Sequence, residues 1–223
     1  MIRTLLLAGI VAGLGSFAGL LGSMAMAAEA TPAPSAKPDL AKAQTTASTV
    51  CAACHGPDGN SPLPAYPSIA GMPAGYISRQ LSNFKAGIRA NPIMQPLAAQ
   101  LSADEMVALG VHFAQQKPKG LAATDAALVQ AGQKLYRGGD ANAGVPACAG
   151  CHAPNGAGIP KNYPRLAGQH ADYTLTQLKA FKAGERGNDK EGKDANGRIM
   201  GVIAGKMSEN QMRAAAEYTQ GLR

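Results

Sequence analysis

Residues 51–59 read CAACHGPDG, and residues 148–156 read CAGCHAPNG. In both stretches two cysteines stand three residues apart and a histidine follows the second: Cys51, Cys54 and His55, then Cys148, Cys151 and His152. On a helical turn, residues three apart lie on one face, so both thiols of a pair can bond to the two vinyl groups of one porphyrin. The histidine that follows then places its imidazole beneath the iron. The motifs therefore predict two covalently attached haem c groups, held by the four cysteines and bound at iron by the two histidines.

Three other uses of the cysteines compete with this interpretation. A thioredoxin-like CxxC needs a βαβ setting, which the sequence does not show. A zinc ion held by four cysteines is a second alternative, and two structural disulfides are a third. Neither of these explains why a histidine directly follows each pair. Haem attachment is therefore the favoured interpretation.

The sequence contains a long internal repeat. With an offset of 97, residues 51–87 align with 148–184 without a gap, and eighteen of the thirty-seven pairs are identical. The second copy then gains nine residues, after which IMQPLAAQLSADEM at 93–106 matches IMGVIAGKMSENQM at 199–212. Self-similarity over this much of the chain indicates two copies of one domain rather than the short units of a solenoid.

The chain divides into an N-terminal leader and two domains. Residues 1–27 have a basic residue near the start, a long apolar run and a small-x-small end, which predict a cleavable signal peptide; an uncleaved anchor is the alternative. Residues 28–40 form an Ala/Pro-rich flexible tail. The boundary between the copies falls in KPKGLAAT, which gives a first domain at 41–120 and a second at 121–223. We therefore expect an exported protein of a bacterial periplasm.

Composition and charge narrow the class of protein further. The single long apolar stretch excludes a polytopic membrane protein, and aromatic residues make up only 4% of the chain. A bulky apolar cofactor would supply the core volume that these few rings leave unfilled. The formal net charge is +7, yet the basic residues are scattered and export removes the chain from nucleic acid, so nucleic acid is not an expected partner. A basic surface favours acidic protein patches or anionic lipid headgroups at a membrane surface, although solubility alone would also explain it.

Both copies are predicted to be mostly helical. The expected helices cover residues 41–54, 75–86 and 103–116 in the first copy and 124–136, 172–183 and 209–220 in the second. Ser102 and Ser208 are expected to cap the last helices, and Thr124 the first helix of the second copy. The charged stretch 185–198 is expected to be a solvated loop. No run alternates between apolar and polar residues, so we predict an all-α fold without a β-sheet.

The sixth ligand of each iron must come from elsewhere in its copy. His112 and His170 have no histidine counterpart in the other copy, and we expect both to be surface or packing residues. The alignment preserves two methionine pairs, at positions 94 and 200 and at positions 106 and 212. The second pair falls within predicted helices, where a core role is the default. We therefore select Met94 and Met200, in loops before the last helices, with Met207 as the rival for the second site.

A further motif, Tyr-Pro-x-x-Ala-Gly, occurs at 66–71 and at 163–168. A turn that packs against the core would explain it. A sharper interpretation is that the carbonyl of Pro67 or Pro164 accepts a hydrogen bond from the N–H of the ligand histidine, and the two interpretations are compatible.

Taken together, the motifs resemble the di-haem cytochrome c4 family over residues 40–223. The matching stretches are CAACHGPDG, YPSIAG, the loop of Met94 with its following LSADE, their second copies and the closing EYTQGLR. The resemblance implies two tandem class I cytochrome c-like domains related by a pseudo-twofold axis, each with histidine and methionine as axial ligands. It also implies an electron-transfer protein rather than an enzyme.

The resemblance also suggests redox partners. The implied donor is a quinol-oxidising membrane complex and the implied acceptor is a haem–copper oxidase. An alternative is the cytochrome subunit of a larger dehydrogenase, such as flavocytochrome sulfide dehydrogenase. A di-haem peroxidase or thiosulfate-oxidising cytochrome is less favoured, because either needs an open iron or an unusual ligand, whereas methionine recurs in both copies.

Overall fold

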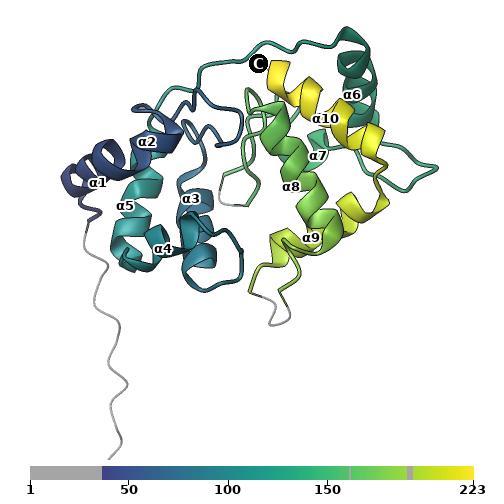
Figure 1. The fold of residues 1–223 in the computed structure, drawn as a ribbon. Coiled ribbons are helices and arrows are strands. Elements are labelled where there is room, and N and C mark those ends of the chain that lie inside the picture. The colour runs from purple at the N-terminus through teal and green to yellow at the C-terminus, as the bar shows by residue number, and fades with distance from the viewer. Residues whose placement is uncertain (1–36, 161, 190–192) are drawn as a thin grey trace, which may run out of the picture. The chain divides into compact units, whose positions relative to one another are not determined.

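The computed structural model describes residues 37–160, 162–189 and 193–223. The predicted signal peptide (1–27) lies outside these residues, as does the tail up to residue 36. Within them the secondary structure is helical, and β-pairing is limited to two isolated bridges, Asp140 with Val145 and Ile159 with Tyr163 (Figure 1). The predicted all-α fold is therefore confirmed. In the same described residues, no helix is long and apolar enough to span a bilayer.

The first copy begins with a continuous helical segment that ends at the first motif. It consists of α1 (Leu40–Thr46), a π-helical turn (Ala47–Cys51) and α2 (Ala52–His55). The Asp39 side chain starts the segment by accepting a hydrogen bond from the amide of Lys42. The expected helix at 41–54 is confirmed, with a π-turn immediately before the cysteine pair that the sequence pattern did not reveal.

The remaining helices of the first copy are α3 (Ala74–Lys85), α4 (Met94–Ala99) and α5 (Ala103–Ala114). Helix α3 packs against α4 and α5, and α1 packs against α5. The approach of α5 to α3 is close because residue 110 is a glycine: a Cβ there would lie 2.4 Å from the carbonyl oxygen of Ala74.

The second copy repeats this arrangement. Its helices are α6 (Ala126–Gly138), α7 (Ala149–His152), α8 (Ala171–Ala183), α9 (Ala195–Lys206) and α10 (Glu209–Gly221). Helix α10 packs against α6 and α8, and α8 packs against α9. Here too a glycine permits the closest contact, since a Cβ on Gly132 of α6 would lie 2.0 Å from the carbonyl oxygen of Ala214.

The predicted caps of the last helices are confirmed. The hydroxyl of Ser102 accepts from the amide of Glu105, whose carboxylate accepts from the amide of Ser102, and Ser208 forms the same capping box with Gln211. The predicted cap at Thr124 is wrong. Asp125 caps α6 instead, because its carboxylate accepts hydrogen bonds from the amides of two residues of the first turn.

Two expected loops are partly helical. Met94 is the first residue of α4, where its amide donates to Asn91 Oδ1, and Met200 lies within α9, which Asp194 caps upstream of the methionine. The prediction of a solvated loop at 185–198 is also partly wrong, since Arg186 and Asp194 are buried and α9 begins at residue 195. Arg186 and Asp194 of this charged stretch thus contribute to packing.

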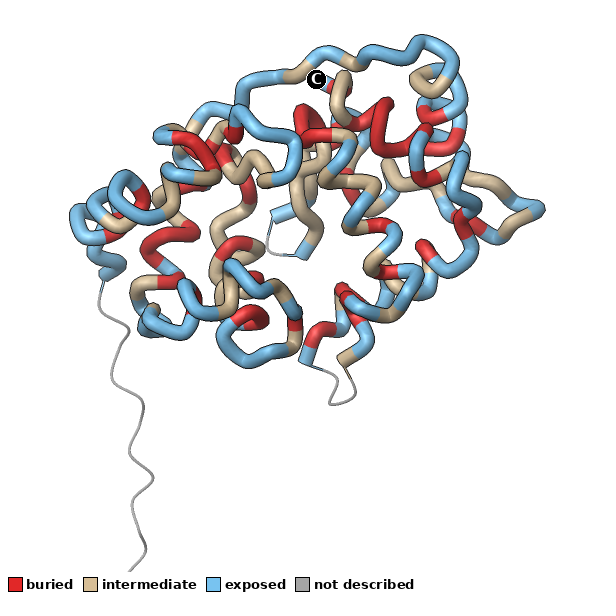
Figure 2. The backbone as a smooth tube through the Cα atoms, viewed as in Figure 1, coloured by how far each residue is buried: buried red, intermediate tan, exposed pale blue. Residues whose placement is uncertain are grey.

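Buried residues lie on the inward faces of the helices in both copies (Figure 2). The first core contains Leu109 and Phe113 of α5 packed on Ala43 and Ala47. The second copy has two adjoining clusters, one around Phe181, Met207 and Met212 and one around Tyr136 and Tyr218. Met207, the rival ligand, is only 2% exposed and belongs to this core.

Candidate functional site

The two motif histidines have the same surroundings. His55 is buried and its Nδ1 lies 2.8 Å from the carbonyl oxygen of Pro67, and His152 is buried with its Nδ1 3.0 Å from the carbonyl oxygen of Pro164. A carbonyl oxygen only accepts, so Nδ1 carries the proton and donates, which leaves the lone pair on Nε2. The predicted histidine–proline contact is confirmed in both copies.

Burial also keeps both imidazoles neutral. The pKa of His55 and that of His152 lie below the ordinary histidine value, because burial disfavours the charged ring more than the proline carbonyl favours it. A neutral imidazole that presents Nε2 is the form that binds iron.

The turn that presents the proline carbonyl is docked on the motif loop in the same way in each copy. The carbonyl of Gly59 accepts from the amides of Ile69 and Ala70, at 2.6 and 2.9 Å. The carbonyl of Gly156 accepts from the corresponding amides of Leu166 and Ala167, at 2.8 and 3.1 Å. The Tyr-Pro-x-x-Ala-Gly motif is therefore both a turn and the support of the histidine.

The four cysteines are half-buried with free thiols. Burial raises the pKa of the Cys51 thiol, and it raises the pKa of Cys148 to about 11. Within the described residues, no three side chains of the His, Cys, Asp and Glu types gather as metal ligands. The two pairs thus do not form one four-cysteine site.

Apolar side chains surround both selected methionines. Met94 is flanked by Ile93 and Leu97, which are 48% and 38% exposed, and Met200 is flanked by Ile199 and Val202, which are 45% and 65% exposed. Large apolar side chains at the surface next to both methionines would be covered by an apolar cofactor.

Comparison with known proteins agrees with these two similar sites. The family model for cytochrome c matches residues 40–117 and again 129–223. Cytochrome c4 of Azotobacter vinelandii is 42% identical over 183 residues, which cover 78% of this chain and 84% of the relative. The chain belongs to the cytochrome c4 family. It is a di-haem c-type cytochrome that transfers electrons, with one haem c in each cytochrome domain.

Two further relatives extend the comparison. The crystal structure of reduced recombinant cytochrome c4 from Pseudomonas stutzeri superposes with a TM-score of 0.76 at 38% identity, covering 84% of this chain and all of that chain. A thiosulfate dehydrogenase electron acceptor of Thiomonas intermedia is 38% identical over 172 residues, covering 75% of this chain and 76% of the relative.

The residues of this cytochrome fit a haem in each half. Each half offers a cysteine pair on one turn, a neutral imidazole with its Nε2 lone pair, a thioether and exposed apolar side chains. A haem also carries two propionate groups, for which cationic partners are expected.

Such cations lie between the halves, in a group that the sequence motifs did not reveal. Six side chains form this interface cluster: Tyr76, Gln80, Arg89, Tyr173, Gln177 and Arg186. Both arginines are buried, and each guanidinium lies over a phenylalanine ring of its own half, 4.6 Å from the centroid of Phe84 and 4.5 Å from that of Phe181. The repeat could have revealed them, because Arg89 and Arg186 keep the offset of 97 two residues beyond the aligned block.

Hydrogen bonds cross the interface cluster in both directions. Arg89 donates to Tyr173 Oη at 2.9 Å and to Gln177 Oε1 at 2.8 Å. Arg186 donates to Tyr76 Oη and to Gln80 Oε1, both at 3.1 Å. The pattern follows the pseudo-twofold relation between the two halves.

The cluster is strongly cationic. Burial raises the pKa of the Tyr173 phenol, but the two adjacent guanidinium groups outweigh it and the net shift is downward. Among the described residues, neither Arg89 nor Arg186 forms an ion pair with a carboxylate. Buried charges are normally paired, so this cluster suits the carboxylate groups of a haem.

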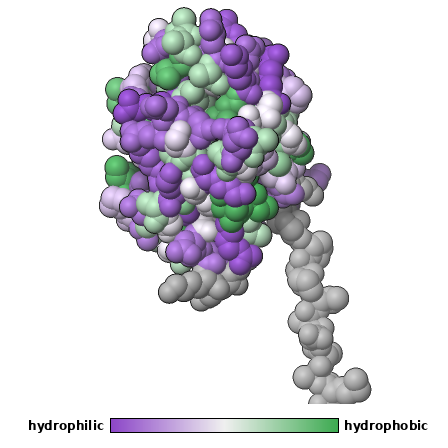
Figure 3. Space-filling view, turned by 90° about the vertical axis from the view of Figure 1, so that its right-hand side faces the viewer, coloured by the Kyte–Doolittle hydropathy of each residue, from purple (hydrophilic) through white to green (hydrophobic). Residues whose placement is uncertain are grey.

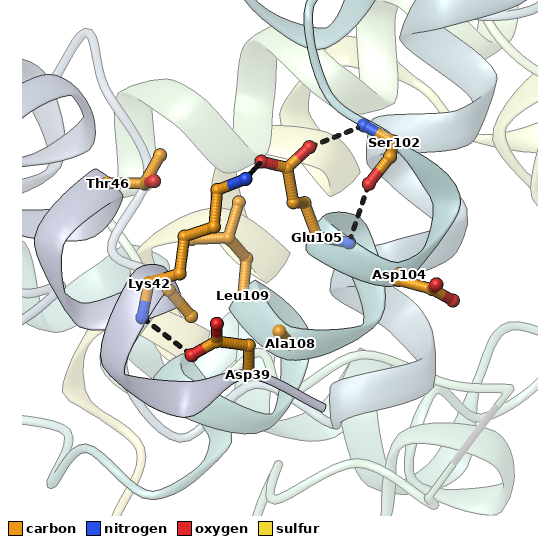
Figure 4. A pocket seen from close by; sticks show the side chains of 9 residues that line it. Asp39, Lys42, Thr46, Ser102, Asp104, Glu105, Ala108 and Leu109 are labelled. Carbon is orange, nitrogen blue, oxygen red and sulfur yellow. Dashed lines mark hydrogen bonds and ion pairs between the residues drawn. The ribbon is translucent and has the colours of Figure 1, made fainter. Parts of the chain in front are cut away.

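A pocket of about 200 Å³ between α1 and α5 contains the 2.8 Å ion pair of Lys42 with Glu105, whose pKa falls to about 2 because of that lysine and the Ser102 amide (Figure 4). The face shown in Figure 3 is mostly hydrophilic, with its hydrophobic residues in small separate groups.

Proposed function

We propose that this cytochrome is a periplasmic electron carrier with a capacity of two electrons. Cys51 and Cys54 would attach the first haem, and His55 and Met94 would bind its iron. Cys148 and Cys151 would attach the second haem, and His152 and Met200 would bind its iron. The observation that carries the proposal is the matched histidine–proline geometry in two copies whose methionines also match.

Several groups of the protein would have separate roles around each iron. When bound, each haem supplies a one-electron iron couple. The proline carbonyl fixes the orientation of the imidazole, and the methionine would also bind the iron, which would leave no position open to a substrate. A thioether and a buried environment favour ferrous over ferric iron, which raises the potential compared with two histidine ligands. Both effects suit electron transfer.

The interface cluster completes the two sites. Arg89 and Arg186 would bind haem propionates, because two buried guanidinium groups with free donor capacity match carboxylate geometry. They would also lower the cost of burying those anions between the halves.

For the partners, we propose a quinol-oxidising membrane complex as donor and a haem–copper oxidase as acceptor. The formal net charge of +7, which falls to +6 when Arg3 leaves with the signal peptide, would favour docking to acidic patches on such partners, or association with an anionic membrane surface. A second candidate is that the cytochrome accepts electrons from a dehydrogenase of sulfur compounds, as a partner or as a subunit. The identity to a thiosulfate dehydrogenase electron acceptor supports this second candidate.

Kinetics with each class of partner would separate the candidates. Stopped-flow mixing of the oxidised cytochrome with a reduced quinol-oxidising complex, and with a thiosulfate dehydrogenase plus thiosulfate, compares the donors directly. Fast reduction only by the second donor would reject the respiratory assignment. A flavin-bearing complex that co-purifies from the native source would identify a subunit of a larger enzyme.

We also propose the export and the domain division. A signal peptide at 1–27 would be removed, leaving a tail at 28–40 and domains at 41–120 and 121–223. Mass spectrometry of the exported protein should give the mass from residue 28 onward plus two haems. Retention of the leader would indicate an anchored form.

A redox titration followed by visible and near-infrared absorption tests the core of the proposal. Two one-electron steps at positive potentials are expected, with a methionine-to-iron band that accounts for both haems. Strongly negative potentials for both haems, or carbon monoxide binding readily at both irons, would refute it.

A further inference from the structure

Two side chains of the second half reach into the first half. Gln169 is 4% exposed and His170 is 7% exposed. Gln169 holds the backbone of Ser68 with both ends of its carboxamide: Oε1 accepts from the Ser68 amide at 2.9 Å, and Nε2 donates to the Ser68 carbonyl at 2.8 Å. The same Oε1 also accepts from the amide of His170 at 3.1 Å, which holds the carboxamide in place.

These contacts lie next to the Pro67 carbonyl, which orients the first motif histidine. Ser68 directly follows Pro67, whose carbonyl accepts the Nδ1–H of His55. The peptide that Gln169 holds is therefore covalently next to the one that orients the imidazole.

His170 acts on the same support from a second direction. Its Nε2 donates to the carbonyl of Ser61 at 2.9 Å, and the Ser61 hydroxyl donates to the carbonyl of Cys54 at 2.9 Å. The amide of Ser61 in turn donates to the hydroxyl of Ser68 at 3.2 Å. Gln169 and His170 thus hold two points, Ser68 and Ser61, of the loop that runs from the first motif to Pro67.

Among the residues that the structure describes, the second half shows no equivalent support. In the repeat, Met72 and Pro73 take the places of Gln169 and His170. Neither side chain has a polar hydrogen, so neither can donate to a loop of the other half. A side chain of the first half does contact the second half: Arg79 Nη2 donates to the carbonyl of exposed Asn162 at 3.1 Å. The supports of the two histidines are therefore different in kind.

We propose that Gln169 and His170 are positioning residues for His55, and that they set the potential of the first haem apart from that of the second. The inference rests on the proposed ligation of iron by His55. A firmly held Pro67 carbonyl accepts a stronger hydrogen bond from Nδ1–H, which makes the imidazole a better donor to iron and stabilises the ferric state. The contact thus lowers the first potential, and its loss raises it.

The repeat supplies the test variant. Gln169→Met with His170→Pro places the residues of the first half at the matching positions of the second. The backbone accepts the proline, because His170 has φ −54° and ψ 131° and Pro73 has φ −53° and ψ 131°. Gln169→Met alone is the milder variant. Arg79→Gln is the matched control, since it removes a contact between the halves without touching the support of His55.

Two measurements on the holoprotein decide the outcome: the potential of each haem, assigned by NMR, and the hydrogen-exchange rate of each histidine Nδ1–H in the reduced protein. In the double variant, exchange at His55 should accelerate about tenfold with His152 unchanged. The first reduction equilibrium should shift by up to about tenfold toward ferrous iron, which corresponds to about 59 mV for one electron. The single variant should give a smaller shift in the same direction.

Three results would overturn the inference. The potential of the first haem could stay unchanged or fall in the double variant, or the potentials of both haems could shift equally. The third is an equal rise of the first potential in Arg79→Gln, which would indicate a general loosening of the interface. The NMR signals of an iron-bound His55 imidazole separate this failure from a failure of the proposed function. Their absence from the unmodified protein would refute the ligation and the inference together, whereas their presence with an unmoved first potential would refute the inference alone.

Discussion

Arg89 and Arg186 donate hydrogen bonds to the same oxygen atom, Oε1 of Gln177, at 2.8 and 2.7 Å. Oε1 of Gln80 likewise accepts from both guanidinium groups, at 2.8 and 3.1 Å. Two buried cations from different halves of the chain thus converge on two neutral amides. Like charges in this position repel each other, and an anion between them would relieve the repulsion.

This convergence predicts that the arginines control the haem potentials. Arg89→Gln or Arg186→Gln should lower the potential of at least one haem, because loss of a nearby positive charge stabilises ferric iron. At roughly 10 Å and an effective dielectric constant of about 20, the change is on the order of 1–2 kcal/mol. A redox titration measures it, with exposed Lys134→Gln as the control. Equal potentials in the arginine variants and the control would rule out a haem-binding role for the cluster.

The axial methionines are tested by truncation. Met94→Ala and Met200→Ala should each remove half of the methionine-to-iron band, and each should allow carbon monoxide to bind one reduced iron, because the sixth position is then open. Met207→Leu is the control and should leave the band intact, since Met207 is a core residue. Loss of the band in Met207→Leu, with retention in Met200→Ala, would reassign the second ligand.

The close contact of α6 with α10 is tested by adding one methyl group. Gly132→Ala should lower the free energy of unfolding by about 1–3 kcal/mol, because the new Cβ would meet the carbonyl of Ala214 and the side chain of Tyr218. Gly138→Ala on the same helix has open space around its Cβ and should instead raise stability by about 0.5–1 kcal/mol. Denaturant titrations measure the free energy of unfolding of both variants. Equal changes in the two variants would show that α6 can move away from α10 without a loss of stability.

A strained residue follows the second motif. Ala153 has φ 66° and ψ 153°, a region that favours glycine, and Gly56 occupies the matching position of the first copy. Ala153→Gly should raise the free energy of unfolding by about 1 kcal/mol, because relief of strain exceeds the added freedom of the unfolded chain. The reciprocal Gly56→Ala should be destabilising, since its Cβ would lie 2.3 Å from the Asn60 carbonyl oxygen. A loss of stability in Ala153→Gly would contradict the assignment of strain.

A buried carboxylate should make stability depend on pH. Glu217 Oε1 accepts hydrogen bonds from the amides of Thr124 and Asp125, and these outweigh burial to hold its pKa below the ordinary value. Its contribution is fully present above the unfolded pKa of about 4.3 and is lost as pH falls through the lower folded pKa. Glu217→Gln should therefore cost about 1–2 kcal/mol at neutral pH.

Denaturant titrations from pH 7 to pH 3 follow this cost. The difference in free energy of unfolding between Glu217→Gln and the parent should disappear at the lowest pH, where the carboxyl of the folded parent is protonated. Glu185→Gln, at an exposed acid, is the control. A gap that stays constant over the whole range would assign the effect to packing rather than to charge.

Local chemistry made much of this cytochrome predictable from its sequence. The cysteine–cysteine–histidine spacing, the repeat and the serine caps depend on residues a few positions apart, where helix geometry fixes which groups meet. The same holds for the proline carbonyl that supports each histidine, because a short turn recurs at the same distance after each motif. The prediction of loops at Met94 and Met200 was wrong because α4 begins at Met94 itself and Asp194 caps α9 upstream of Met200, at points where the apolar pattern is weak.

The arrangement of the two halves was decided by the tertiary structure alone. The sequence shows that Arg89 and Arg186 are equivalent in the repeat, but not that both donate to one oxygen of Gln177. It shows that Gln169 and His170 have no counterparts, but not that they hold the backbone beside Pro67. These contacts join residues that are 84 to 109 positions apart, and only the packing of one folded half on the other brings them within hydrogen-bonding distance.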